Sequence, residues 1–229
     1  MRMVLEVIVQ SLDDARAALE GGADRLEVVR AIEDGGLTPP LELVHEIAAH
    51  VGLPLRVMVR ENAGFRIDDG ELDRLQSAAY AFESAGVHGV VVGFADPGGV
   101  RMEEVMSVLA EAPRVPVTFH RAFDTLIDPV AAIPIVAACP QVDRILTSGG
   151  DGSAEDRSGR LQRYSMVAGG LLNIVAGGGV DEDSIKVFAR TQCVQEIHVG
   201  RAARADSHPS AAVSAKRVAA LRKLIDGSG

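Results

Sequence analysis

The chain has 229 residues, of which 47% are hydrophobic and 3% aromatic, and it carries a net charge of −9. This length and apolar content suffice to bury a substantial core, while the acidic balance argues against nucleic-acid binding, which needs an excess of Lys and Arg. Cys139 and Cys193 are far apart and form no CxxC motif, so no disulfide framework is predicted. No basic and apolar leader opens the chain, and no apolar run approaches the roughly 20 residues that cross a bilayer. We therefore expect a cytoplasmic protein that binds neither nucleic acid nor membrane.

Short β-branched runs alternate with longer, Ala-rich amphipathic stretches along the chain. The predicted strands cover residues 4–9, 25–29, 55–59, 89–93, 115–119, 143–147, 172–176 and 196–200. The predicted helices cover residues near 11–20, 40–50, 69–85, 102–111, 128–138, 154–168, 181–190 and 210–225. Eight successive strand–helix units are typical of a (β/α)₈ TIM barrel, with an open doubly wound sheet as the alternative. Because no linker divides the chain, we predict a single TIM-barrel domain over residues 1–229.

Polar residues on the predicted strands, or just after them, indicate where the chemistry lies, since TIM-barrel active sites form at the C-terminal ends of the strands. Glu6 and Glu27 lie inside apolar runs, where an ionised carboxylate needs a counter-charge, a metal or a proton. One interpretation is a structural salt-bridge network in which Arg60, Arg121 and the histidines neutralise them. The alternative, which the clustering at one end favours, is a site for acid–base chemistry. The candidate catalytic residues are Glu6, Glu27, His120 and His198.

Glycine-rich segments follow two of the strands, TSGG at 147–150 and AGGGV at 176–180. Glycine lets backbone N–H groups approach an anion closely, although it also serves simply to make tight turns. Arginine adds a fork of donors that matches carboxylate or phosphate. The candidate substrate-binding residues are Arg60, Arg121, Thr147, Ser148, Gly149, Gly177 and Gly178.

The positions of the lysines argue against Schiff-base chemistry. The chain has three lysines, at 186, 216 and 223, and all three fall in predicted helices. A Schiff-base aldolase needs a desolvated lysine at a strand end. What remains is proton transfer, or a metal-assisted reaction, on a small anionic compound.

Several segments together resemble the CutC copper-homeostasis family over residues 4–200. They are GADRLEVV (22–29), GGLTP (35–39), VTFHRAFD (117–124), DRILTSG (143–149) and AGGGV (176–180), in that order. The resemblance implies a TIM barrel, an intracellular homo-oligomer and a role in copper handling. It also implies that the site is formed by the residues at matching positions, which are Glu6, Glu27, Arg60, His120, Arg121, Ser148 and His198.

The chain departs from that family at the positions where copper-binding members carry strand cysteines, which are here Ile8, Val29 and Val199. Cu(I) prefers thiolate and thioether ligands, and Met58 is the one soft donor predicted nearby. Three hypotheses follow. The first is a protein of copper homeostasis that binds copper weakly or acts indirectly. The second is an enzyme of lyase or isomerase type, acting by acid–base chemistry on a small carboxylate- or phosphate-bearing substrate. The third is a divalent metal held by Glu and His.

Overall fold

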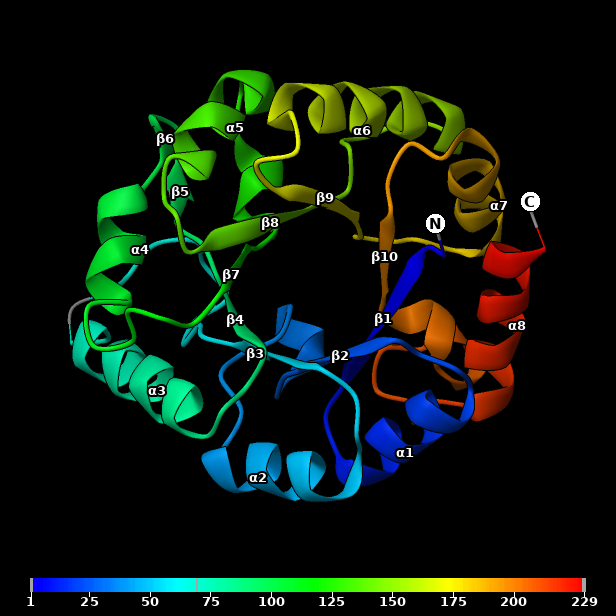
Figure 1. Cartoon of the computed structure of the whole chain (residues 1–229), viewed down its shortest axis with the longest axis horizontal. Helices are drawn as coiled ribbons and strands as arrows, with labels where there is room; N and C mark the ends of the chain where they lie inside the picture. Colours follow the sequence, from blue (N-terminus) through cyan, green and yellow to red (C-terminus); the bar gives the residue numbers. More distant parts are fainter. Residues whose placement is uncertain (1, 69, 228–229) are drawn as a thin grey trace.

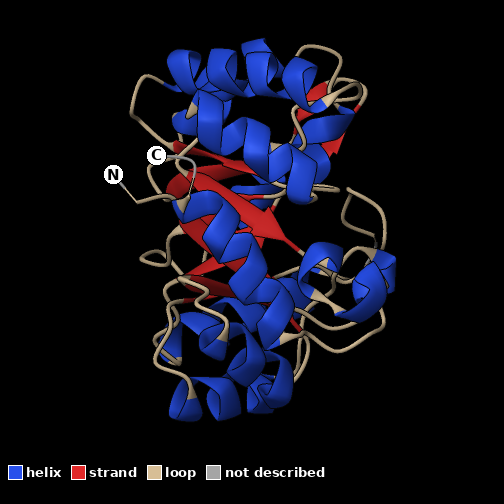
Figure 2. Ribbon diagram, turned by 90° about the vertical axis from the view of Figure 1, so that its right-hand side faces the viewer, coloured by secondary structure: helices blue, strands red, loops and turns tan. Residues whose placement is uncertain are grey.

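The computed structural model describes residues 2–68 and 70–227. Within them, eight parallel strands close into a barrel in the order β1-β10-β9-β8-β7-β4-β3-β2. Figure 1 looks along this barrel and shows the helices α1 to α8 in a ring around it. Figure 2, turned by 90°, shows the strands enclosed by the helical layer. The predicted TIM barrel is confirmed.

The strands and helices follow the predicted periodicity closely. The barrel strands are β1 (Val4–Val9), β2 (Arg25–Val28), β3 (Leu55–Met58), β4 (Gly89–Val92), β7 (Val117–Phe119), β8 (Val142–Thr147), β9 (Asn173–Ala176) and β10 (Glu196–Val199). The helices are α1 (Leu12–Glu20), α2 (Leu41–His50), α3 (Leu72–Ser84), α4 (Met102–Val108), α5 (Pro129–Ala137), α6 (Ala154–Ala168), α7 (Glu182–Thr191) and α8 (Ala215–Asp226). None of the described helices combines the length and the apolar character that crossing a membrane requires.

Shorter elements occupy the loops. The 3₁₀ turns are η1 (Ile32–Asp34), η2 (Arg121–Thr125), η3 (Arg201–Ala203) and η4 (Ala205–Ser207). A two-stranded hairpin of β5 (Ala95–Asp96) and β6 (Gly99–Val100), which the periodicity did not predict, follows β4. The strand predicted over 115–119 begins at Val117, because Pro116 has no N–H with which to join a neighbouring strand.

Alternate residues of each strand face opposite sides of the barrel wall, as the pleat of a strand requires. The outward residues, such as Leu5, Val28 and Phe119, are fully buried in the large core cluster that also contains helix residues such as Ala15 and Ile47. This burial between strands and helices holds the barrel together. The inward residues are different, because many of them are charged.

An ion layer crosses the interior of the barrel. Arg25, at the start of β2, contacts the carboxylates of Glu6 on β1 and Glu196 on β10. Arg144 Nε donates to Glu196 across 2.9 Å. Arg25, Glu6 and Glu196 are all buried, with exposed fractions of 6%, 2% and 5%. Each charge of this layer is therefore neutralised inside the barrel rather than by solvent.

The ion layer continues toward the N-terminal end of the strands. Arg144 also contacts Asp143, which accepts two hydrogen bonds from Arg56 at 2.6 and 3.0 Å. The sequence had suggested Arg60, Arg121 and the histidines as the counter-charges of Glu6. For the two arginines this expectation was wrong, since the guanidinium that neutralises Glu6 comes from Arg25.

Removing the central cation tests this layer. We expect Arg25→Met to lower the free energy of unfolding by about 3–5 kcal/mol, because two buried carboxylates each lose the guanidinium that they share. Arg16→Met is the matched control, since the Arg16 side chain on α1 is 55% exposed and changes stability by less than about 1 kcal/mol. Urea denaturation of both variants measures the difference. Equal effects of the two substitutions would contradict a stabilising ion layer.

Candidate functional site

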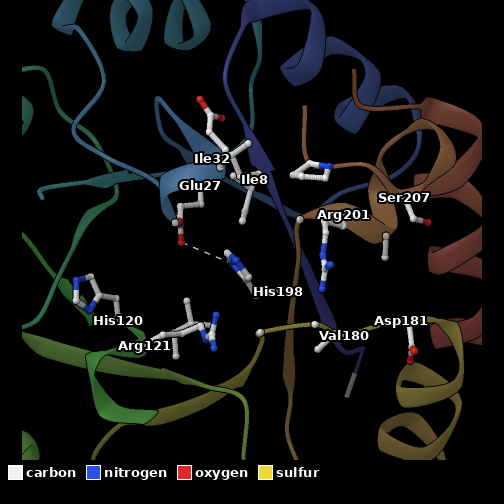
Figure 3. A pocket seen from close by; sticks show the side chains of 18 of the residues that line it. Ile8, Glu27, Ile32, His120, Arg121, Val180, Asp181, His198, Arg201 and Ser207 are labelled. Atoms are coloured by element: carbon white, nitrogen blue, oxygen red, sulfur yellow. Dashed lines mark ion pairs between the residues drawn. The ribbon is translucent and has the colours of Figure 1, made fainter. Parts of the chain in front are cut away.

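A cavity of about 850 Å³ opens where the barrel strands end and their loops begin (Figure 3). Six of the predicted site residues line it, namely Glu27, Arg60, His120, Arg121, Gly178 and His198. The other five, which are Glu6, Thr147, Ser148, Gly149 and Gly177, lie beside the cavity without lining it. The predicted residues are thus brought to one end of the barrel, but they divide into a lining set and a supporting set.

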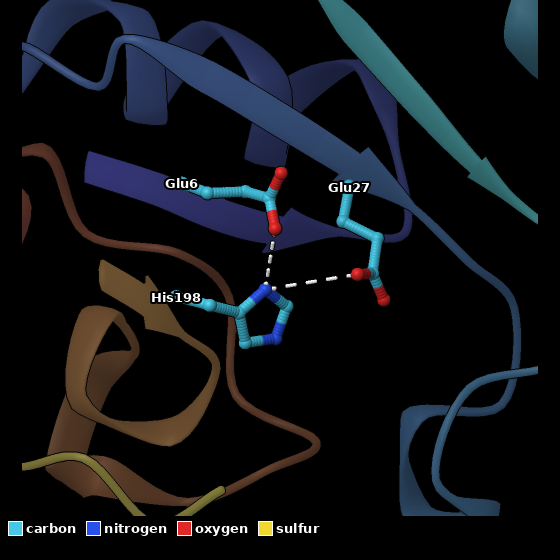
Figure 4. A group of neighbouring side chains, drawn as sticks. All are labelled: Glu6, Glu27 and His198. Carbon is cyan, nitrogen blue, oxygen red and sulfur yellow. Dashed lines mark hydrogen bonds and ion pairs between the residues drawn. The ribbon is translucent and has the colours of Figure 1, made fainter. Parts of the chain in front are cut away.

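The floor of the cavity holds two carboxylates and an imidazole, shown in Figure 4. His198 Nδ1 lies 2.7 Å from Glu6 Oε1 and 3.6 Å from Glu27 Oε2. Glu6 is also bound by Arg25, whereas Glu27 Oε2 is buried and has no hydrogen-bond partner in the described structure. An unpaired buried carboxylate oxygen is costly, so this group is one that a proton or a ligand would satisfy.

The three groups have very different proton affinities. Burial raises the pKa of Glu27 to about 7, helped by Glu6 and opposed by His198 and Arg25. Burial by itself lowers the pKa of His198, but the carboxylates of Glu27 and Glu6 outweigh it and raise the pKa overall. For Glu6, burial is outweighed by Arg25 and His198, which hold its pKa far below the usual range. Glu6 is therefore a fixed anion, and Glu27 exchanges a proton near neutral pH.

His120 occupies the wall of the same cavity and has a fixed tautomer. Its Nδ1 accepts a hydrogen bond from the Ala122 N–H at 3.2 Å, so it caps the turn η2. Burial, and then the nearby Arg60, lower the pKa of His120 to about 3. The ring is thus neutral at pH 7, and the proton resides on Nε2. In this state the His120 Nε2–H is a hydrogen-bond donor and not a base.

Arg60 is held mainly by its own loop. Its guanidinium donates to the carbonyls of Gly35, Ala63 and Gly64, and it stacks on the Phe65 ring 4.8 Å from the centroid. Carbonyls do not neutralise its charge, and among the described residues it has no ion-pair partner within 4.0 Å. Arg60 therefore shapes the 60–65 loop and also contributes positive charge to the cavity.

The segment TSGG is fixed by an aspartate that the sequence reading did not single out. Asp124, which ends VTFHRAFD, accepts hydrogen bonds from Thr147 Oγ1 at 2.6 Å and from the Ser148 N–H at 3.0 Å. It also accepts a hydrogen bond from Arg121 Nε at 2.9 Å. Gly149 N donates to Thr147 Oγ1. These hydrogen bonds hold Arg121 and the loop in place and use the polar groups of Thr147, Ser148 and Gly149, which do not line the cavity.

Two further features of the site were not predicted. Arg201, in η3, lines the cavity but was not among the candidate residues. The same rule that selected His120 and Arg121, a polar residue just after a strand, would have selected it. One part of the wall is apolar and is formed by Ile8, Ile32, Met58, Leu146 and Val180. The cavity thus combines charged groups with an apolar wall.

The sequence matches a known protein family over most of its length. The sequence profile of the CutC family matches residues 3–203. The chain belongs to the CutC family. It is 32% identical over 206 residues to the human copper homeostasis protein cutC homolog, an alignment that covers 89% of this chain and 75% of the human one. A CutC family protein from Caulobacter vibrioides (strain NA1000 / CB15N) is 36% identical over 199 residues, which cover 86% of this chain and 80% of the relative.

Solved structures agree with the fold. The CutC crystal structure from Streptococcus agalactiae superposes with a TM-score of 0.78 at 21% identity, covering 86% of this chain and 97% of that one. Thiamine phosphate pyrophosphorylase from Pyrococcus furiosus superposes with a TM-score of 0.65 at 17% identity, covering 99% of this chain and 96% of the other. At these identities the likeness concerns the barrel itself.

The ligands that Cu(I) prefers are scarce in this member of the CutC family. Ile8 and Val29, at positions where copper-binding members were expected to carry cysteine, pack with Met58 in a small apolar cluster. Val199 faces the outer core, and both cysteines are buried in that core away from the cavity lining. Met58 is the one sulfur-containing residue in the described lining. The residues present therefore do not fit a Cu(I) site.

The raised pKa of Glu27 makes stability depend on pH. Between pH 4.5, the ordinary pKa of a glutamate, and about pH 7, Glu27 holds a proton in the folded protein that it has lost in the unfolded chain. The stabilisation that this proton gives is complete below pH 4.5 and is lost as the pH rises through 7. In wild type the free energy of unfolding should therefore fall by up to about 3 kcal/mol over this range, and in Glu27→Gln this fall should be absent. Urea denaturation between pH 4.5 and 8 measures it. Identical slopes for wild type and variant would show that Glu27 titrates normally.

Proposed function

We propose that this protein is an enzyme that performs acid–base chemistry on a small anionic substrate. The observation that carries the proposal is Glu27, a buried carboxyl at the floor of an open cavity, with a pKa of about 7 and an oxygen that has no hydrogen-bond partner among the described residues. A general acid or base works best when its pKa is close to the working pH. A carboxylate present only for stability would be paired, as Glu6 and Glu196 are.

His198 would act beside Glu27. Its Nδ1 faces Glu6 and Glu27, and Figure 4 shows Nε2 on the opposite edge of the ring. Because Glu6 stays ionised, it accepts a hydrogen bond from the His198 Nδ1–H and fixes the orientation of the ring. The Nε2 atom is then free to take or give a proton. This arrangement provides a second acid–base group whose orientation does not depend on the substrate.

The remaining lining residues suit a substrate with a carbonyl group and a negative charge. The His120 Nε2–H would donate to an oxygen on which charge develops, and neutral imidazole does this without losing its proton. Arg60 and Arg121 supply positive charge. Proton abstraction next to a carbonyl, as in isomerases and lyases, fits these roles. The expectations of a cytoplasmic homo-oligomer that binds neither nucleic acid nor membrane remain predictions.

Copper homeostasis, the role named for the human relative, would in this chain be indirect. The cavity offers carboxylates, imidazoles and arginines, with Met58 as the one sulfur-containing residue of its described lining, whereas Cu(I) prefers thiolate and thioether ligands. We infer that any link to copper passes through the small-molecule reaction rather than through Cu(I) held at the barrel mouth.

Deuterium exchange tests the enzyme proposal without knowledge of the reaction. Pools of small carboxylates and phosphate esters are incubated with the protein in D₂O, and NMR follows the loss of carbon-bound proton signals. We expect exchange in at least one compound, and Glu27→Gln should slow it by about 10²–10⁴-fold, the usual contribution of a general base.

Glu20→Gln, an exposed change at the end of α1, is the matched control and should exchange at the wild-type rate. Circular dichroism and denaturation show whether the variants are folded. Exchange that persists in a folded Glu27→Gln protein would remove Glu27 from the mechanism.

A divalent metal is the second candidate, favoured by one observation. Ligand atoms of Glu6, Glu27 and His198 all lie within 4.8 Å of one another. One imidazole and two carboxylates suit Zn²⁺ or a similar borderline ion, although Glu6 would have to remain bound to Arg25. If this cluster holds a metal, elemental analysis of the purified protein should find about one ion per chain. Glu27→Gln should then release it, whereas Glu20→Gln should not. Metal-free protein that binds no ion on titration with Zn²⁺ would exclude the site.

A further inference from the structure

We propose that the loop after β9, together with Arg121 and Arg201, forms a subsite for a phosphate group, so that the substrate is a phosphate monoester. This inference rests on the function proposed above, because it assigns the substrate class of the same cavity. It adds Arg201 and the backbone of two glycines to the residues that bind substrate. β9 and β10 are the seventh and eighth strands of the barrel, and the loops after these strands frequently bind phosphate in TIM barrels.

The direction of two backbone N–H groups is set by Arg157 of α6. Its Nη2 donates to the carbonyls of Gly177 at 3.2 Å and Gly178 at 3.1 Å. In a trans peptide the C=O and the following N–H point in opposite directions. The N–H groups of Gly178 and Gly179 therefore point away from Arg157. Both glycines line the cavity, and within the described residues neither N–H has a hydrogen-bond partner.

Glycine is required at both positions. The φ angles of Gly178 and Gly179 are +70° and +73°, which residues with a Cβ rarely adopt. A Cβ on Gly178 would lie 2.6 Å from Arg121 Nε, and a Cβ on Gly179 would lie 3.8 Å from Arg201 Nη2. Each glycine thus has a guanidinium packed against it. Two backbone donors and two guanidinium groups converge on one turn, as the positions of Arg121, Val180 and Arg201 in Figure 3 indicate.

Two arginines supply positive charge at this turn. Arg121 shares one nitrogen with Asp124, while Arg201 has no ion pair or side-chain hydrogen bond within the described residues. Three carboxylates at the start of α7 also line the cavity. Glu182 lies 3.8 Å from Arg217 and Asp183 lies 2.8 Å from Lys186, so these two face cations, whereas Asp181 accepts hydrogen bonds from Ser184 and keeps its charge. Among the described residues none of the three forms an ion pair with Arg201, which is therefore available to an anion.

The number of donors favours phosphate over carboxylate. A single bidentate guanidinium already satisfies both oxygens of a carboxylate. Here two backbone N–H groups and two guanidinium groups surround the turn, which suits the three terminal oxygens and the double charge of a phosphate monoester. Glu27, His198 and His120 line the same cavity, so a phosphate held at the turn would leave the rest of the substrate against the acid–base groups and the apolar wall.

Inorganic phosphate is the probe that tests the subsite. Isothermal titration calorimetry at constant ionic strength should show saturable binding to the wild-type chain and weaker binding of acetate. We expect Arg201→Gln to weaken phosphate binding about tenfold or more. Arg190→Gln removes the same charge from an exposed position near the end of α7 and should bind like wild type. In ¹⁵N-labelled protein, the amides of Gly178 and Gly179 should shift most on addition of phosphate.

The outcomes separate this inference from the enzyme proposal. No phosphate binding by wild type, equal binding by Arg201→Gln, tighter binding of acetate, or amide shifts elsewhere in the chain would each overturn the subsite. Glu27→Gln should keep phosphate binding, because it removes no donor from the turn. If that variant loses exchange while phosphate fails to bind, the subsite alone is wrong. If phosphate binds as expected and Glu27→Gln exchanges normally, the acid–base role alone is wrong.

Discussion

The contact between Arg25 and the two carboxylates of Glu6 and Glu196 is the interaction on which the rest of the site depends. A barrel interior of charged residues is stable only if each charge finds a partner before solvent is excluded. Arg25 supplies that partner from the first residue of β2. Because it keeps Glu6 ionised, Glu6 in turn holds His198 by its Nδ1. Glu27 lies two residues after Arg25 on the same side of β2. Among the described residues it has no arginine in contact with its carboxylate, and it becomes the group that titrates near neutral pH.

In the loops after the strands, too, some residues orient others that face the cavity. Asp124 accepts hydrogen bonds from the TSGG turn, and Arg157 donates hydrogen bonds to carbonyls of the GGG turn, both from outside the cavity. Their effect is directional, since binding the carbonyls of Gly177 and Gly178 turns the next N–H groups the other way. Arg60 acts similarly on the loop that contains Phe65. Polar residues around the site thus orient one another, and only a few retain unused donors or acceptors for a ligand.

The fold was predictable because strands and helices alternate with clear periodicity, and the observed bounds differ from the predicted ones by only a few residues. The lining residues Glu27, His120 and His198 were predictable because a TIM barrel brings strand ends together. The residues that pair with these groups and orient them could not be predicted in the same way. Arg25 is separated by 19 and 171 residues from Glu6 and Glu196, so only the closed register of β1, β2 and β10 reveals the contact. The roles of Asp124 and Arg157 depend likewise on loop conformation, which no periodicity encodes.

The placement of Glu27 suggests why the ion layer ends where it does. A further arginine beside Glu27 would lower its pKa in the way that Arg25 lowers that of Glu6, and the group would then be ionised at all physiological pH values. The His198 imidazole, which it shares with Glu6, is a weaker and titratable counter-charge. Stability alone would favour complete pairing of every buried carboxylate, since an unpaired one is costly. Glu27 is the carboxylate that the ion layer leaves without an arginine, and it lies at the floor of an open cavity. This is the arrangement expected of a group that transfers protons.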